Sequence, residues 1–401
     1  REKREGGGAG MAFGALLLAS SLSWSGVLHG SSWRARSPSL LASSSPSWTD
    51  LLSRPVRIET KADWDSLSPP QQLGAMGRLS SLHLTLLSSS APASLALASG
   101  VGRPPHALAL GALYTGTLAL WHLACNMLND AMDLEADRLH SGEVRAFRVE
   151  YATHPLAQGF ISLSRFRLVI SALVAAAAAG SVACVELAPA CAWSFPIGAL
   201  VALMYTPIAK PLAVGEILTF LIWGALMFGG GWAVATGGVT LVQAFALSSP
   251  FALGAFAVTL GRNIDKLDDT TTAGLRTLPA ALGRMPARYL AVAALLGQHV
   301  ATIALVGARL FPATAILAPL ITAMFELRQS VTKFLAPRPS DAPPRTQAHQ
   351  GSMGSTSAPS ASWPLWYTAF AAWHAVTFGY WLVLSFVLAW ATSSIRVLRA
   401  A

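Results

Sequence analysis

Long apolar runs, separated by short polar segments, occupy most of the chain between residues 79 and 390. A helix needs about 20 consecutive apolar residues to cross the hydrocarbon core of a bilayer, and all but the eighth run approach that length. The pattern therefore predicts an all-α fold, a polytopic membrane helical bundle of about nine transmembrane helices. Their expected positions are residues 79–99, 106–127, 168–187, 191–209, 217–235, 242–260, 289–308, 311–325 and 365–390.

Composition and charge agree with a membrane protein. Hydrophobic residues make up 53% of the chain and charged residues only 12%, whereas soluble domains carry roughly 25% charged residues. A net charge of +9 would suggest nucleic acid as the partner of a soluble protein. Here the basic residues lie in loops, so we expect no nucleic-acid partner. With the N-terminus inside, the loops follow the positive-inside rule. The outer loops and the C-terminal tail hold only Arg103, Arg309, Arg396 and Arg399.

Residues 1–60 differ from the rest of the chain. No acidic residue occurs between Met11 and Trp48, where an apolar core is followed by a Ser-rich segment that carries Arg34 and Arg36. This order is typical of a targeting extension and resembles the two-part presequence of algae with secondary plastids. The alternative is a disordered, low-complexity N-terminus. We exclude these residues from the fold and, on the first interpretation, expect a plastid membrane.

Residues 61–401 are then expected to form one membrane domain. Near its start, residues 64–78 are expected to form a short interfacial helix. Residues 336–362 are rich in Pro, Ser and Gly, a composition that predicts a flexible loop before the last helix.

A polar segment, residues 129–138, directly follows the second apolar run. If the helix continues through it, Asn129, Asp133 and Asp137 lie at i, i+4 and i+8 on one face, about 12 Å from first to last. Asp130 lies roughly 100° away from that face, and we rank it second. Carboxylates at the end of a membrane helix are costly and mark a functional site by default. A row of amide and carboxylate oxygens suits Mg²⁺.

A second polar segment, residues 263–279, also follows an apolar run. Within it, Asp265 and Asp269 again lie at i and i+4 of a helix. Facing each other, the two carboxylate ladders would hold two Mg²⁺ ions with a diphosphate between them.

Basic residues lie in the same predicted inner loops as the two ladders. They are Arg138, Lys210, Lys266 and Arg276. A transporter of bare divalent cations would weaken its own site with such neighbours, whereas a Mg²⁺–diphosphate complex needs carboxylates for the metal and basic groups for the phosphate oxygens. The combination implies ionisation of an allylic diphosphate. An electron-rich aromatic carbon then attacks the allylic cation in a dry membrane cavity.

The two segments resemble the paired Asp-rich motifs of the UbiA superfamily of intramembrane prenyltransferases. The resemblance extends from about Gly77 to about Tyr289 and includes residues 154–162, which are similar to the family segment RPLxSGxIS. The chain departs from the family pattern in three places. His154 replaces the usual Arg, one extra residue separates Asp269 from Gly274, and Pro279 replaces the commoner Ala.

Further segments are most similar to the branch that prenylates 1,4-dihydroxy-2-naphthoate in menaquinone and phylloquinone biosynthesis. These are residues 205–210, 215–216, 224–227, 236–237 and 276–278. This resemblance implies an enzyme that transfers a prenyl group from a polyprenyl or phytyl diphosphate to that aromatic acceptor. Homogentisate, 4-hydroxybenzoate, chlorophyllide and lipid-ether acceptors are the alternatives within the superfamily.

The resemblance also implies residue roles, with Mg²⁺ as the cofactor. The predicted catalytic and metal-binding carboxylates are Asp133, Asp137, Asp265 and Asp269, with Asn129 as a further metal ligand. The predicted substrate-binding residues are Asn129, Asp130, Arg138, Lys210, Lys266, Tyr205 and Arg276. Tyr205 would line the cavity near the cation or the acceptor, or serve as an interfacial aromatic.

Other polar residues receive no catalytic role. Glu216 is left open, and we interpret His122 as a packed, hydrogen-bonded histidine. The cysteines lie within apolar runs and lack the spacing of a metal site, so we interpret them as small buried side chains; they are Cys125, Cys184 and Cys191. The alternatives of another class are a transporter using intramembrane carboxylates and a non-catalytic membrane scaffold. Membrane lipid is the expected surrounding, and no protein partner is predicted.

Overall fold

The structure is a computed structural model that describes residues 58, 60–102, 104–135, 154–209, 212–267, 276–339 and 365–400. Over these residues the chain consists of helices joined by turns, and no strand occurs among them. This confirms the all-α fold. The predicted targeting extension and most of the predicted loop at 336–362 lie outside the described residues.

Each of the nine predicted segments coincides largely with helix. Within the described residues, six helices are long and apolar enough to cross a membrane. They are Pro105–Met132, Leu163–Leu187, Gly215–Thr236, Leu241–Asp265, Arg284–Gly307 and Trp366–Ile395. The number of nine crossings stays a prediction, because the remaining segments are shorter or interrupted.

The chain divides into two compact units, each described here by itself. Unit 1 is made of residues 1–82, 122–174 and 343–361, and unit 2 of the rest. Two of the boundaries fall within long helices, α6 (Pro104–Met132) and α9 (Leu163–Leu187).

The described part of unit 1 starts with two short helices where an interfacial helix was predicted, α3 (Lys61–Asp65) and α4 (Pro69–Met76), followed by a 3₁₀ turn, η2 (Leu79–Ser81). Thr60 starts α3 through a capping box, in which its hydroxyl accepts from the Asp63 amide and the Asp63 carboxylate accepts from the Thr60 amide. Ser68 and Gln71 form the corresponding box at α4. Local sequence therefore determines where these helices begin.

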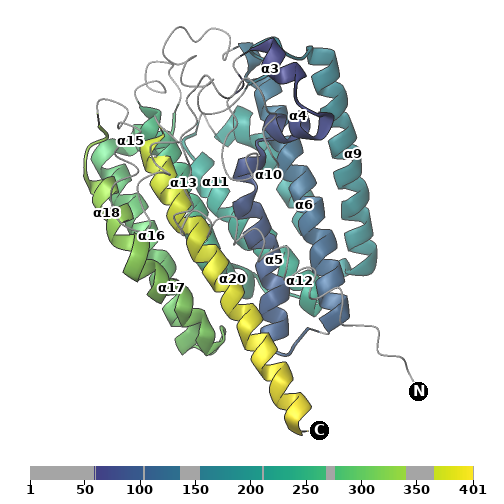
Figure 1. The fold of residues 1–401 in the computed structure, drawn as a ribbon, viewed down its shortest axis with the longest axis vertical. Coiled ribbons are helices and arrows are strands. Elements are labelled where there is room, and N and C mark those ends of the chain that lie inside the picture. Colours follow the sequence, from purple (N-terminus) through teal and green to yellow (C-terminus); the bar gives the residue numbers. More distant parts are fainter. Residues whose placement is uncertain are drawn as a thin grey trace. The chain divides into compact units, whose positions relative to one another are not determined.

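Unit 2 contains the remaining helices. In chain order they are α5 (His83–Ala98), η3 (Pro189–Cys191), α10 (Ser194–Met204), η4 (Tyr205–Ala209), α11 (Gly215–Leu221), η5 (Ile222–Leu226), α12 (Met227–Thr236), α13 (Leu241–Asp265), α15 (Leu278–Leu282), α16 (Arg284–Gly307), η6 (Ala313–Ile316), α17 (Leu317–Thr322), η7 (Ala323–Leu327), α18 (Arg328–Leu335) and α20 (Trp366–Ala400). Helix α13 packs against both α16 and α20 (Figure 1).

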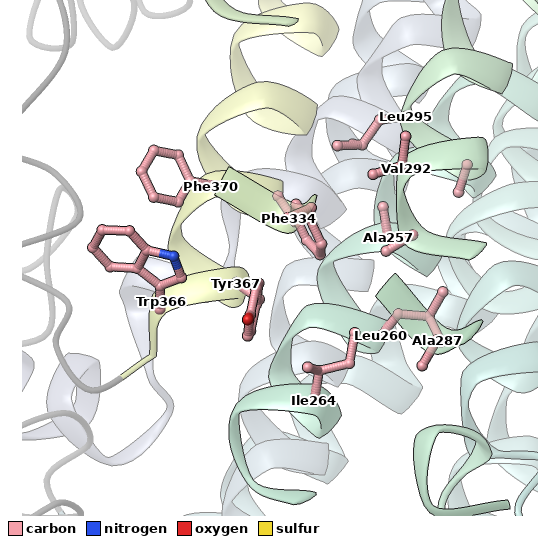
Figure 2. Packing of buried hydrophobic residues seen from close by; sticks show 13 residues of the cluster. Ala257, Leu260, Ile264, Ala287, Val292, Leu295, Phe334, Trp366, Tyr367 and Phe370 are labelled. Carbon is pink, nitrogen blue, oxygen red and sulfur yellow. The ribbon is translucent and has the colours of Figure 1, made fainter. Parts of the chain in front are cut away.

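The core of unit 2 nearest the second Asp-rich segment joins α13, α16, α18 and α20. Figure 2 shows Phe334 of α18 and Tyr367 of α20 beside aliphatic side chains of α13 and α16. The Phe334 and Tyr367 ring centroids are 5.4 Å apart, and the Tyr367 hydroxyl donates to the Ala336 carbonyl at 3.1 Å. The buried Arg288 donates from Nε to the Phe334 carbonyl and lies 5.3 Å from the Tyr367 ring centroid. Tyr367, at the start of α20, is therefore held from several sides.

Helices α13 and α20 cross very closely at Gly261. A Cβ atom added there would lie 2.8 Å from both the carbonyl carbon and the carbonyl oxygen of Tyr367, and 3.0 Å from the Thr368 amide nitrogen. These are backbone atoms and cannot move aside as the end of a side chain can. The glycine therefore sets how near the start of α20 comes to the last turn of α13.

We predict that Gly261→Ala separates the two helices at this point and destabilises the protein by about 1–3 kcal/mol, the usual range for overpacking. The measurement is thermal unfolding in detergent.

The matched control is Gly198→Ala in α10, where an added Cβ meets nothing within 4 Å. Since alanine favours helix over glycine by roughly 0.5–1 kcal/mol, this variant should be at least as stable as wild type. Equal stability of the two variants would contradict the close crossing at Gly261.

Candidate active site

The first Asp-rich motif lies at the C-terminal end of α6. Asn129 is in its last turn, and the amide of Asp133 donates to the Asn129 carbonyl at 2.9 Å. The predicted face of Asn129, Asp133 and Asp137 requires the helix to continue to residue 137. In the structure α6 ends at Met132, and Asp133 forms a bend. Asp and Asn side chains compete for backbone hydrogen bonds and so weaken a helix where they cluster. Asn129 and Asp133 are nevertheless one helical turn apart, and both are half-buried.

A second polar row runs along α6 beside the motif, formed by His122, Asn126 and Asp130 at i, i+4 and i+8. His122 Nε2 lies 2.9 Å from the Ser81 hydroxyl, and Asn126 Nδ2 donates to the Gly77 carbonyl at 2.9 Å. This confirms His122 as a packed, hydrogen-bonded histidine. The row attaches α6 to the turn that follows α4.

Asp130 completes this row with an ion pair to Arg78. The Arg78 guanidinium donates from Nη2 to Asp130 Oδ1, and His154 Nδ1 lies 3.6 Å from the same oxygen. The Asp130 side chain is 5% exposed. Arg78 has φ +56°, in the left-handed region that is uncommon for residues other than glycine. Asp130 was predicted to bind substrate. In the structure it pairs with Arg78 and lies beside His154, and substrate contact stays a prediction.

The second Asp-rich segment begins at the end of α13, in unit 2. Asp265 is the last residue of α13, and Lys266 follows it as the C-cap. The helical i, i+4 relation between Asp265 and Asp269 is therefore not provided by α13. Arg276 is exposed and lies just before α15, whose N-cap is Thr277.

Asp265 caps α20. Its Oδ1 accepts from the Tyr367 amide at 3.0 Å, and its Oδ2 accepts from the Thr368 amide at 2.9 Å and the Thr368 hydroxyl at 2.8 Å. These amides belong to the second and third residues of α20, where a helix lacks internal acceptors. The residue before the helix, Leu365, has no side-chain acceptor, so the cap comes from α13 instead.

Glu216, which sequence reasoning left open, is buried at the start of α11. Its Oε1 accepts from Asn263 Nδ2 at 2.6 Å and from the Leu278 amide at 3.1 Å. Tyr205 lies in the π-helical turn η4 and is half-buried. A Cβ added to Gly215 would lie 3.4 Å from both Cε2 and the hydroxyl oxygen of Tyr205, so this ring packs beside the residue that precedes Glu216.

The remaining predicted site residues lie outside the described residues. They are Asp137, Arg138, Lys210 and Asp269. Over the part of the chain that the structure describes, no three His, Cys, Asp or Glu residues form a group able to hold a metal ion. The described oxygen donors still fit Mg²⁺ in kind, because Asn129 and Asp133 offer an amide and a carboxylate one turn apart. A carboxylate has about four acceptor positions, and Asp265 uses three of them, which leaves one on Oδ1.

Sequence reasoning missed Arg78 and Asn263 and the capping of α20. The row of polar residues at 122, 126 and 130 was visible as a helical period, and it could have identified a second polar face on α6. No sequence signal links Asp265 to Tyr367, which is 102 positions further along the chain.

Apolar helices that end in polar, carboxylate-bearing segments define an integral membrane protein with carboxylates at the ends of its helices. The model of the UbiA prenyltransferase family matches residues 86–343. This is more than half of the chain, and the chain therefore belongs to the UbiA prenyltransferase family. It is a multi-pass membrane protein of a family of prenyltransferases.

A solved structure of a relative shows the same fold. A UbiA homologue from Aeropyrum pernix K1, solved in its apo form, is 19% identical and has a TM-score of 0.54, covering 75% of this chain and 97% of its own. A UbiA homologue from Archaeoglobus fulgidus, solved with GPP and Mg²⁺ bound, is 17% identical with a TM-score of 0.48, covering 76% and 96%. No curated protein matches the sequence.

The Arg78–Asp130 pair generates a prediction about stability. Arg78→Met leaves a buried carboxylate without its cationic partner, and such a loss costs about 3–5 kcal/mol. Replacing both partners, as Arg78→Met with Asp130→Leu, removes the unpaired charge and should recover part of that loss. Thermal unfolding in detergent measures both, and a double variant less stable than Arg78→Met would contradict the pairing.

The capping of α20 by Asp265 gives another prediction about stability. Asp265→Ala leaves two amides at the start of α20 without their acceptor, which should cost about 1–2 kcal/mol and raise hydrogen exchange in the first turn of α20. Asp65→Ala is the control, because Asp65 forms only an exposed pair with Lys61, worth at most about 1 kcal/mol. Unchanged exchange at Tyr367 and Thr368 in Asp265→Ala would refute the cap.

Proposed function

We propose that this protein catalyses Mg²⁺-dependent transfer of a prenyl group from a polyprenyl or phytyl diphosphate to an aromatic acceptor. The proposed acceptor is 1,4-dihydroxy-2-naphthoate, and the product would be a precursor of menaquinone or phylloquinone. The observation that carries the proposal is the placing of Asn129, Asp133 and Asp265 at the ends of two membrane helices, in a chain of the UbiA prenyltransferase family. The naphthoate branch rests on sequence resemblance.

Metal and diphosphate binding are assigned to different side chains. Asn129 and Asp133, with Asp137, are proposed ligands of one Mg²⁺, and Asp265 with Asp269 of another. Bound Mg²⁺ supplies positive charge that stabilises the leaving diphosphate.

The basic residues bind the diphosphate oxygens by charge-assisted hydrogen bonds. In this proposal they are Arg138, Lys210, Lys266 and Arg276. Tyr205 is proposed to face the prenyl cation or the acceptor, since an aromatic face attracts a cation. The apolar helices keep water away from the cation, so that the acceptor carbon rather than water attacks it. The attacked ring carbon then loses its proton, or its carboxyl group as CO2, which restores the aromatic ring.

Two parts of the proposal concern the cell rather than the reaction. The N-terminal extension supports a plastid membrane as the location, and the long isoprenoid tail of the substrate would lie among membrane lipids. The alternative acceptors in the superfamily are homogentisate, 4-hydroxybenzoate, chlorophyllide and lipid ethers. The same assay distinguishes them, because each acceptor gives a product of different mass.

The test is an assay on purified protein in detergent with Mg²⁺ and geranylgeranyl or phytyl diphosphate. Each acceptor is supplied separately, and products are identified by mass. We expect a prenylated naphthohydroquinone, identified as the quinone after oxidation in air, that disappears with EDTA. Asp133→Ala should lower the rate by about 100-fold or more, as removal of one charge-stabilising group from an active site does.

Glu135→Ala is the matched control, because Glu135 is an exposed carboxylate two residues away that lies off the proposed face. It should retain the wild-type rate. Product from another acceptor alone would contradict the naphthoate assignment, and the absence of product from every pair with folded wild-type protein would contradict prenyl transfer.

A further inference from the structure

A buried carboxylate without an assigned role lies beside the second Asp-rich segment. Glu216 is the second residue of α11 and is 1% exposed. A single oxygen, Oε1, accepts both the side-chain hydrogen bond from Asn263, at 2.6 Å, and the backbone hydrogen bond from Leu278, at 3.1 Å. Burying a carboxylate is costly unless hydrogen bonds compensate it, so these two contacts explain how it is accommodated.

The two donors flank one segment of the chain. Asn263 lies in the last turn of α13, two residues before Asp265, and Leu278 is the first residue of α15. Between them lie Lys266, Asp269 and Arg276, all predicted site residues. Glu216 thus contacts the second Asp-rich segment, residues 263–279, near both of its ends.

The start of α15 needs such an acceptor. The Thr277 hydroxyl accepts from the Ala280 amide and so satisfies one of the first amides of the helix. The Leu278 amide is another that no acceptor within the helix can reach, and Glu216 satisfies it. The α15 side of the segment is therefore fixed by two caps, one local and one from α11.

We propose that Glu216 is a positioning residue that fixes both ends of the second Asp-rich segment and so sets where Asp265, Lys266 and Arg276 lie. This inference rests on the proposed function and deepens it. Glu216 acts as a hydrogen-bond acceptor and does not contact the substrate or the metal. A displacement of about 1 Å at a reacting group can cost on the order of 100-fold in rate, so a fixed segment matters for catalysis.

If Glu216 acts as a hydrogen-bond acceptor, two substitutions at this position should differ in their effect on the rate. Glu216→Gln retains a carbonyl oxygen that accepts from both Asn263 and Leu278, whereas Glu216→Leu retains neither contact at similar volume. We expect Glu216→Gln to stay within about fivefold of the wild-type rate, and Glu216→Leu to lose about 10–100-fold with a raised Mg²⁺ requirement. Glu186→Leu is the matched control, since Glu186 is an exposed carboxylate near the end of α9, and it should leave the rate unchanged.

A charge swap tests the Asn263 contact directly. Asn263→Asp alone places two carboxylates against each other and should lower the rate, because like charges repel at hydrogen-bond distance. In Glu216→Gln with Asn263→Asp, the new amide donates to the new carboxylate while its carbonyl oxygen still accepts from Leu278. Recovery of rate in the double variant relative to Asn263→Asp is expected. A general loss of folding would not produce it.

Hydrogen exchange provides a readout that is independent of catalysis. In Glu216→Leu, a peptide containing Leu278 should exchange faster than in wild type, while one from α16 should not. If wild-type protein forms no product with any acceptor, the proposed function fails, and this exchange still tests the contact.

Two results would overturn the positioning role in an active protein. Glu216→Gln as inactive as Glu216→Leu would mean that the charge itself takes part in the reaction, as a base or a metal ligand would. Wild-type activity and wild-type exchange in Glu216→Leu would mean that the contacts fix nothing.

Discussion

A buried carboxylate in a membrane protein needs hydrogen-bond donors from the protein, because water is not available to supply them. This requirement determines which chain segments lie together around three buried carboxylates. Asp130 is paired with Arg78, Glu216 accepts from Asn263 and Leu278, and Asp265 accepts from Tyr367 and Thr368. In each case the donor belongs to a different segment of the chain from the carboxylate. Each carboxylate therefore holds two segments of its unit together.

Three of the donors are backbone amides at helix starts. Leu278 begins α15, and Tyr367 and Thr368 lie in the first turn of α20. Backbone amides at a helix start have no acceptor within the helix and carry the positive end of its dipole. A carboxylate satisfies both needs, so Glu216 and Asp265 stabilise helix starts, and Asp265 is a proposed metal ligand as well.

The positions of the long helices and the family of the chain could be predicted from the amino-acid sequence alone. Helix positions follow from apolar runs of bilayer length, and the paired Asp-rich motifs already resemble the family that the comparison confirms. The capping boxes of α3 and α4 are equally local. What could not be predicted is which partner each buried carboxylate takes. Leu365 gives no capping signal for α20, and only the packing of α13 against α20 brings Asp265 to its amides.

The capping of α20 by Asp265 has a thermodynamic consequence if Asp265 is also a metal ligand. A cation at this carboxylate and the first turn of α20 would then draw on the same oxygens, so each would change the stability of the other. Linkage makes that effect equal in both directions. Metal affinity at the end of α13 would then depend on the stability of the first turn of α20. A helix that holds Tyr367, 102 positions further along the sequence, would thus modulate the affinity for the cofactor.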